Sequence, residues 1–340
     1  NTTSGTLTKS STGTWTLSGA NTYTGITTIS AGILKVGHVT ALGTIAGKTV
    51  VSDGAALDLN GIAIANAEPL DLNGTGVTSS GAIYNSSATA ASVGAGAITL
   101  ITASTINASA GAITLSGAIA NSTYLLTVDG AYNTTLSGVI GNGAGGITKT
   151  GNGTLTLSGA NTFTGGLAIK SGTVVANVSN ATTVSGAAGP SGYAITLGDS
   201  AGASASLLAN SFTVSNAINL GASAVGTLTI GNNAGSTAAI FSGAIGLNGN
   251  NLTISSTGTG STTISGGITG TGNLTISNGS TSATTTISTT SVNNSGTITN
   301  SGTGTGLATI SGGIGSNVTT INENSSTSAL TISTTAITVN

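Results

Sequence analysis

Residues 252–277 read LTISSTGTGSTTISGGITGTGNLTIS, and this stretch decides the fold. Its first four residues, Leu252 to Ser255, return unchanged as Leu274 to Ser277. Aliphatic residues recur at steps of about 22 to 24 residues through the C-terminal third of the chain, a period typical of solenoids. The three rows are Ile230, Ile254, Ile276, Ile298 and Ile321; Phe241, Ile264, Ile287, Ile310 and Ile332; and Ile245, Ile268, Val292, Ile314 and Ile337. Each coil of such a chain buries its apolar face only by stacking on the next coil.

The residues around the rows indicate β-strands, because β-branched residues alternate with small polar ones. Clusters of Gly, Asn and Ser, such as residues 270–273, are typical of corners, since these residues accept turn conformations. The chain has 55 Gly and no helical run of Ala, Leu, Glu and Lys, which leaves no helix of ordinary length. We therefore predict an all-β fold: a parallel β-solenoid of roughly 22 to 24 residues per coil, continuous over residues 1–340.

Charge is the second informative feature. Charged residues make up 4% of the chain, whereas about a quarter of the residues of a typical soluble domain are charged. The formal net charge is −2. No charged side chain occurs between Asp199 and Glu323. A near-neutral surface favours association, and uncapped solenoid ends expose unpaired strand edges. These features predict self-assembly into a fibre or coat through the solenoid ends and the neutral Thr, Ser and Asn faces.

Composition excludes several other classes. The chain has no Cys and hence no disulfide framework, and no run of apolar residues is long enough for a transmembrane helix. The five basic residues are scattered lysines, which does not favour nucleic-acid binding. Because the chain has no Met, we expect Asn1 to follow a removed signal peptide or to begin a segment of a longer protein. We expect no cofactor.

A long repeat is superimposed on the coil period. Residues 18–25 read SGANTYTG and return as SGANTFTG at residues 158–165, an offset of 140. This repeat relates residues 1–140 to residues 141–215, whereas residues 216–340 contain the regular short-period coils. The aligned pairs Trp15/Leu155 and Tyr23/Phe163 predict packed positions.

Both copies resemble the autotransporter-associated β-strand repeat of bacterial surface proteins. The hallmark of that family is a Gly-Thr-Leu-Thr-Leu-Ser-Gly-Ala-Asn-Thr-Tyr-Thr-Gly run followed by a strand, and residues 153–165 and 13–36 match it. The resemblance implies a right-handed parallel β-helix and export from a Gram-negative type of cell. It also implies a passenger, adhesin or stalk that binds a host surface or glycan, and not an enzyme. Residues near Asn340 do not resemble the aromatic-ended strands of full-length members, so the export route stays open.

Four acidic residues lie close together in the sequence, and polysaccharide-cleaving β-helices place carboxylates on one face. They are Asp53, Asp58, Glu68 and Asp71, with Lys48 near them. The repeated pattern of residues 57–61 and 70–74 favours strands with Leu inward, Asp outward and an Asn-Gly corner. Because 13 residues span about half a coil, we expect Asp58 and Asp71 to face different ways. A calcium site and a carbohydrate-acting enzyme remain the alternatives here.

His38 is the only histidine. A zinc site or a catalytic triad would need it to be joined by Cys, Asp or further His groups. We expect it in a loop or a wall and predict no metal site.

The outward residues beside the first row are the remaining site candidates. We expect them to stack as a polar ladder two residues wide, because strand alternation turns them away from the core. Its members are Thr253, Ser255, Thr275, Ser277, Thr297, Thr299, Thr320 and Asn322. Three interpretations stay open: a solvated face, a lateral interface between identical rods, or a binding face for ice or a crystalline polysaccharide. Two serines and the asparagine break the threonine regularity that ice matching favours.

Overall fold

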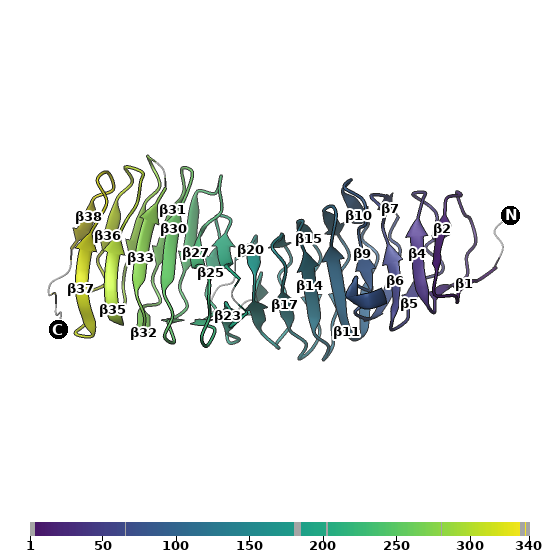
Figure 1. Ribbon diagram of the computed structural model, residues 1–340, viewed down its shortest axis with the longest axis horizontal. Helices are drawn as coiled ribbons and strands as arrows, with labels where there is room; N and C mark the ends of the chain where they lie inside the picture. Colours follow the sequence, from purple (N-terminus) through teal and green to yellow (C-terminus); the bar gives the residue numbers. More distant parts are fainter. Residues whose placement is uncertain are drawn as a thin grey trace. The chain divides into compact units, whose positions relative to one another are not determined.

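The computed structural model describes residues 4–64, 66–179, 185–201, 203–279, 281–333 and 337. It divides into two compact units, residues 1–165 (unit 1) and 166–340 (unit 2). Each unit is a stack of parallel β-coils, with about 23 residues per turn (Figure 1). The described residues contain no α-helix and one short 3₁₀ turn, η1 (Val77–Ser79). The predicted fold class is confirmed; the right hand of the coil and the continuity of the two units stay predictions.

Unit 1 has three walls, each made of parallel strands that stack coil upon coil. The first wall contains β1 (Leu7–Lys9), β3 (Thr27–Ile29), β5 (Thr49–Val51), β8 (Leu70–Gly74), the first part of β11 (Ile98–Ala108), β13 (Ile119–Ala120) and β16 (Ile140–Gly141). The second contains β2 (Thr14–Leu17), β4 (Gly32–Val36), β6 (Ala55–Asp58), β9 (Ile83–Tyr84), the last part of β11, β14 (Leu126–Gly130) and β17 (Ile147–Lys149). The third contains β7 (Ala63–Ile64), β10 (Ala91–Val93), β12 (Ile113–Leu115), β15 (Thr134–Leu136) and β18 (Thr154–Leu157).

Unit 2 repeats this three-walled plan. Its first wall contains β19 (Leu167–Ile169), β23 (Ile195–Leu197), β26 (Ile218–Leu220), β29 (Ile245–Gly246), β32 (Ile268–Thr271) and the first part of β35 (Val292–Asn300). Its second contains β20 (Gly172–Ala176), β24 (Ala205–Ala209), β27 (Leu228–Asn232), β30 (Leu252–Ser256), β33 (Leu274–Asn278), the last part of β35 and β37 (Val318–Glu323). Its third contains β25 (Thr213–Val214), β28 (Ala238–Phe241), β31 (Ser261–Ile264), β34 (Thr285–Ile287), β36 (Ala308–Ile310) and β38 (Leu330–Ile332).

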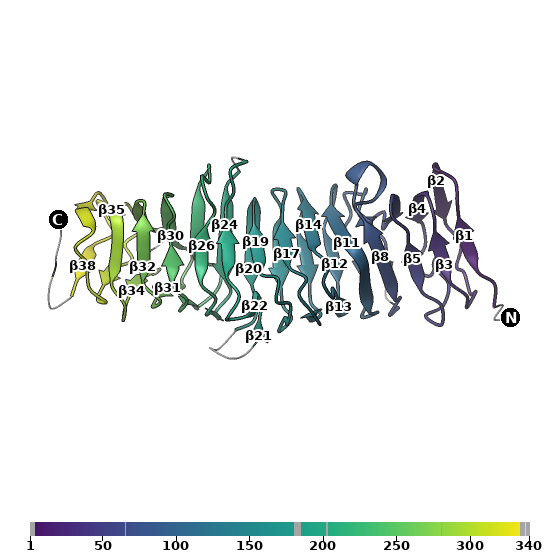
Figure 2. The same cartoon turned by 90° about the horizontal axis from the view of Figure 1, so that it is seen from below.

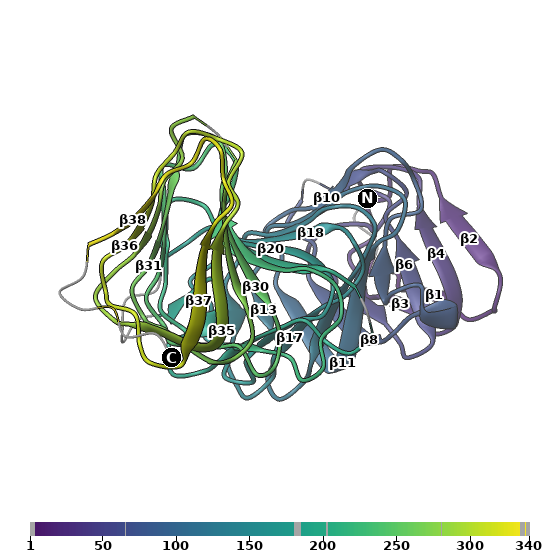
Figure 3. The same cartoon turned by 60° about the vertical axis from the view of Figure 1, so that its left-hand side comes forward.

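The walls of unit 2 enclose its core. In Figure 3, β30, β35 and β37 form one wall, and β31, β36 and β38 lie across the interior from them. A short antiparallel hairpin of β21 (Ser185–Gly186) and β22 (Gly189–Pro190) projects from the coils, as Figure 2 shows.

Two of the three predicted rows form unbroken columns inside unit 2. Phe241 pairs with Ile264, and the register continues through Ile287 and Ile310 to Ile332. The third row pairs in the same way from Ile245 to Ile337. The members from residue 241 to residue 310 have at most 1% of their surface exposed. Stacked aliphatic side chains therefore form the core that the 23-residue period predicts.

The first row is wrong at one step. Ile230, Ile254 and Ile276 pair as predicted, but Ile276 pairs with Asn300, and Ile298 pairs with Leu274. The cause is the length of a corner. Leu274 lies six positions after Ile268, and Ile298 lies six positions after Val292. Two coils that are aligned at Ile268 and Val292 therefore stay aligned at Leu274 and Ile298. Since Leu274 and Ile276 are both buried, the sequence period could not distinguish them.

A recurring Ser-Gly pair turns the chain from the third wall to the first. In unit 1 the glycines are Gly117, Gly138 and Gly159, each stacked on the glycine of the preceding coil. A Cβ on Gly138 would lie 2.2 Å from the carbonyl oxygen of Gly117. The backbones of successive coils thus approach more closely at this corner than a side chain allows.

Three buried polar side chains between the second and third walls of unit 2, Asn278, Thr285 and Ser256, are hydrogen-bonded. Asn278 is fully buried; its amide nitrogen donates to the carbonyl of Gly306 at 3.1 Å, and its amide oxygen accepts from Thr285 at 2.6 Å. Ser256 contacts the Thr285 hydroxyl at 2.8 Å. These bonds satisfy groups that would be costly to bury alone.

Candidate functional site

The eight predicted ladder residues all lie on the second wall of unit 2. Thr253 pairs with Thr275 and Ser255 with Ser277, and further along Thr297 pairs with Thr320 and Thr299 with Asn322. Between β33 and β35, however, Thr275 pairs with Thr299. The ladder therefore consists of two aligned pieces offset by two residues, for the corner-length reason given above. Its role as an assembly or ligand face stays a prediction.

The third wall of unit 2 carries a more regular ladder that the sequence interpretation missed. Thr263, Thr286, Thr309 and Thr331 pair in one unbroken column. A serine stands two positions after each threonine, just beyond the end of the strand, at residues 265, 288, 311 and 333. The backbone N–H groups of these serines continue the same register with bonds of 2.8 to 3.0 Å. The signal was present in the sequence: each second-row isoleucine from Ile264 onward stands in a Thr-Ile-Ser triplet.

The hydroxyls of this third-wall ladder face outward, because the isoleucine between each Thr and Ser points into the core. Rows of adjacent coils lie about 4.8 Å apart, and Thr and Ser of one triplet about 7 Å apart. Among the described residues, the side chains of the four threonines make no hydrogen bond to protein. The third-wall ladder therefore presents a column of threonine hydroxyls without protein partners in the part of the chain that the structure describes, whereas the Ser311 hydroxyl donates to the carbonyl of Ile287 at 3.5 Å.

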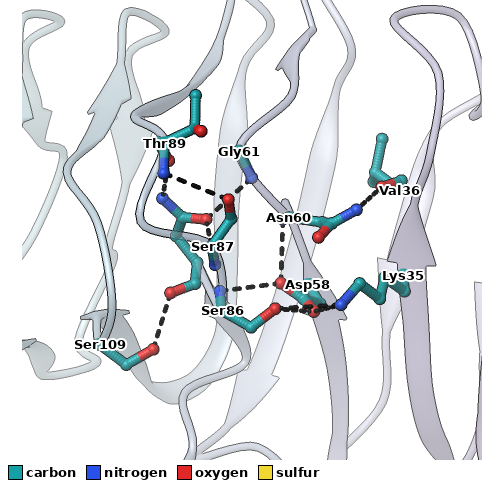
Figure 4. A network of polar contacts seen from close by, with 10 residues as sticks. Lys35, Val36, Asp58, Asn60, Gly61, Ser86, Ser87, Thr89 and Ser109 are labelled. Carbon is teal, nitrogen blue, oxygen red and sulfur yellow. Dashed lines mark hydrogen bonds and ion pairs between the residues drawn. The ribbon is translucent and has the colours of Figure 1, made fainter.

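Asp58 lies in a saturated polar network on the second wall of unit 1 (Figure 4). Its Oδ1 accepts hydrogen bonds from the backbone N–H of Asn60 at 2.9 Å and of Ser86 at 3.1 Å. Its Oδ2 accepts from the Ser86 hydroxyl at 2.6 Å and lies 3.7 Å from Lys35 Nζ. Burial, together with Asp58 nearby, raises the pKa of Tyr84 to about 12.

The outward direction predicted for Asp58 does not bring it to the solvent, since this residue is 1% exposed. The chain around Ser86 covers it, held in place by a second buried side chain. The Asn85 amide oxygen accepts from the N–H groups of Gly61 at 2.9 Å and Ser87 at 3.1 Å, and its nitrogen donates to the carbonyl of Thr89 at 2.8 Å (Figure 4). This network stabilises the Asn60-Gly61 corner, where both residues have positive φ.

The remaining acids occupy different environments. Asp71 lies on the first wall, where it forms an ion pair with Lys48, and Asp53 is exposed in the turn before β6. Glu68 is buried inside the coil, where its Oε1 accepts a hydrogen bond from Thr49 at 2.8 Å. Burial raises the pKa of Glu68 to about 7, and the bond from Thr49 lowers it in part. Glycosidic cleavage needs two carboxyl groups flanking one bond, and two of these four acids, Asp58 and Glu68, are each only 1% exposed.

His38 lies in a turn. Its Nδ1 contacts the Thr40 hydroxyl at 3.1 Å and accepts the Thr40 N–H at 3.2 Å. Within the described ranges, no group of three or more His, Cys, Asp and Glu side chains is arranged to hold a metal ion. The same residues include no helix with the length and apolar character needed to cross a membrane.

The 140-residue repeat is reproduced strand by strand. The bounds of β1, β2, β3 and β4 return as those of β17, β18, β19 and β20, each shifted by 140 residues. Each copy buries a lysine at the end of its first strand: Lys9 is 3% exposed and Lys149 is 1% exposed. Both ammonium groups donate to the carbonyl two residues ahead, Lys149 to Gly151 at 2.7 Å. Burial lowers the pKa of Lys149 to about 8, while Asp129 raises it in part.

Comparison with protein-family models matches residues 7–36 and 147–176, each to the passenger-associated-transport-repeat. The chain carries two passenger-associated-transport repeats. Over these two segments the chain is similar to the repeats of autotransporter passengers, and such repeats imply a surface or extracellular location. Neither the curated proteins nor the solved structures include a significant match to the chain.

The two passenger repeats differ in how they pack. Leu155 and Phe163 in the second repeat are fully buried, as predicted. Trp15, which aligns with Leu155, is 44% exposed, so the packed position predicted for it is wrong. Among the described residues, its strand β2 pairs with β4 on one side and with no strand on the other. Both passenger repeats nevertheless keep the turn glycine that opens their fourth strand, Gly32 and Gly172, at positive φ.

Proposed function

We propose that this chain is a non-catalytic stalk within an autotransporter passenger, displayed on the surface of a Gram-negative type of cell. The two passenger repeats, residues 7–36 and 147–176, carry the proposal. The burial of Asp58 and Glu68 supports a role without catalysis. A stack of coils that each bury an aliphatic column also supports a stalk, because every added coil extends the structure with the same contacts.

Surface labelling of intact cells tests this proposal. Antibodies raised against the purified chain are expected to label the outside of cells of the source organism, as seen by immunogold electron microscopy, and external protease is expected to remove the label. A cytoplasmic protein serves as the control for intact cells. Labelling that appears only after the cells are permeabilised would contradict the proposal.

We propose as a second function that the passengers associate side by side into a fibre or coat. The specific support is the pair of hydroxyl ladders on the second and third walls of unit 2, in a region without charged side chains between Asp199 and Glu323. Uncharged faces do not repel copies of themselves. A surface glycan is the other partner that such hydroxyl faces could bind, through hydrogen bonds to its own hydroxyl groups.

Two matched double substitutions test side-by-side association. Thr286→Lys with Thr309→Lys places two charges on the third-wall ladder, and Thr275→Lys with Thr299→Lys places two charges on the second-wall ladder. We expect the purified chain to assemble in sedimentation velocity. The third-wall pair should dissociate these assemblies more completely, because that ladder has an unbroken register. If the unsubstituted chain stays monomeric while a glycan array binds it, the ladders bind glycan and the assembly proposal is wrong.

A further inference from the structure

A cluster of polar groups lies inside unit 1 at the level of the first three coils. Thr27 and Thr49 are paired on the inner side of the first wall and are 1% and 0% exposed. Thr49 donates to Glu68 at 2.8 Å, and the hydroxyls of Tyr23 and Thr27 lie 2.7 Å apart. These four residues form what we call the acid cluster: Tyr23, Thr27, Thr49 and Glu68. At this level, hydrogen-bonding side chains occupy part of the interior that aliphatic side chains fill elsewhere in unit 1.

Glu68 has no charged partner in this cluster. It is 1% exposed, and its Oε2 is buried without a hydrogen-bond partner among the described residues. From the preceding coils, Tyr23 is the titratable group that faces it, and Lys48, beside Thr49, is half-exposed and paired with Asp71. The following coil packs against it with Gly96, and residues 94–97 contain no titratable side chain. Burial without compensation disfavours the ionised carboxylate.

The second passenger repeat provides an apolar counterpart. Tyr23 aligns with Phe163, and Thr27 aligns with Leu167. In the next coil, Thr27 pairs with Thr49, whereas Leu167 pairs with Ile195. Phe163, Leu167 and Ile195 are at most 2% exposed. The same three positions are therefore filled in one copy by hydroxyl-bearing side chains and in the other by apolar side chains.

We propose that the acid cluster is a proton-operated device that keeps the coils around residues 20–75 closed in acid and lets them open locally above neutral pH. The buried Glu68 carboxyl keeps its proton up to a pKa of about 7, whereas its usual pKa is 4.5. Between these values the closed form binds more protons than the opened form, so its stability falls as the pH rises. Each unit of pKa difference between the two forms changes the equilibrium constant for opening by up to a factor of ten. This constant should therefore rise roughly 70-fold from pH 5 to pH 8.

Direct titration is the first test. The chain contains two glutamates, Glu68 and Glu323, so labelling with ¹³C-glutamate gives two side-chain carboxyl resonances in NMR. Glu323→Gln assigns them by removing one. We expect the Glu68 resonance to titrate with a midpoint near 7. A midpoint below about 5.5, within the usual range for Glu, would overturn the proposal and requires no variant of Glu68 to fold.

Hydrogen exchange followed by mass spectrometry tests the opening. Wild type and Glu68→Gln are compared at the same pH, which cancels the pH dependence of intrinsic exchange. In peptides from residues 20–75, the ratio of wild-type to variant exchange should rise by roughly 70-fold from pH 5 to pH 8. In peptides around Ile195 the ratio should stay constant. A constant ratio in residues 20–75 as well would show that Glu68 does not control opening and would overturn the proposal.

Discussion

Ile287→Ala is expected to lower the free energy of unfolding of unit 2 by about 2 to 5 kcal/mol. Ile287 is fully buried in the unbroken second column, between Ile264 above and Ile310 below. Alanine removes buried methyl groups and leaves a cavity that the neighbouring coils fill only in part. Denaturant unfolding followed by circular dichroism measures the loss.

The control lies one residue away. Thr286 precedes Ile287 on β34 and turns its side chain outward, so Thr286→Ala should change stability by less than about 0.5 kcal/mol. Equal losses for the two variants would mean that the second column is not the core of this stack.

Gly138→Ala is expected to destabilise unit 1 by about 3 kcal/mol, near the upper end of the cost of overpacking. The added Cβ would lie 2.2 Å from the carbonyl oxygen and 2.6 Å from the next backbone nitrogen of the coil below, at Gly117 and Ala118. Backbone atoms cannot rotate away as a flexible side chain can, so two coils must separate. Thermal unfolding measures the effect, and hydrogen exchange should locate it at the corner.

Gly13→Ala is the matched control for this substitution, because a Cβ at Gly13 meets no atom within 4 Å. It should leave the melting temperature almost unchanged or raise it slightly, since alanine restricts the unfolded chain more than glycine does. A loss at Gly13 as large as that at Gly138 would show that glycine flexibility, and not close approach of the coils, explains the corner.

The periodic part of the fold was predictable because its signal is local. Alternation of β-branched and small polar residues specifies strands, and the return of Ile264, Ile287 and Ile310 at a nearly constant spacing specifies the coil. Likewise, the 140-residue repeat was visible in the near-identical residues 18–25 and 158–165, and it is reproduced in the bounds of eight strands.

The candidate site was less predictable. The ladder at Thr275 and Thr299 slips because the register follows the number of residues in a corner, and Leu274 and Ile276 are equally apolar. The Thr-Ile-Ser ladder was missed although its pattern is simple, because outward Thr and Ser residues flank more than one row and the sequence does not show which of them align. Nothing in the sequence near Asp58 indicates that Ser86, in the following coil, would cover it.

By itself, the sequence determined that this protein is a β-solenoid of about 23 residues per coil with small, neutral outward faces, because strand alternation and coil period are properties of neighbouring residues. Only the tertiary structure decided how the residues of one coil align with those of the next. This alignment determines which hydroxyls form a column, that Asp58 is covered, and that one oxygen of Glu68 has no hydrogen-bond partner among the residues that the structure describes. Glu68 shows the reason: it is 1% exposed and accepts its hydrogen bond from Thr49, in an earlier coil of the stack. Such contacts depend on the stacking register, which corner lengths set and residue type alone does not encode.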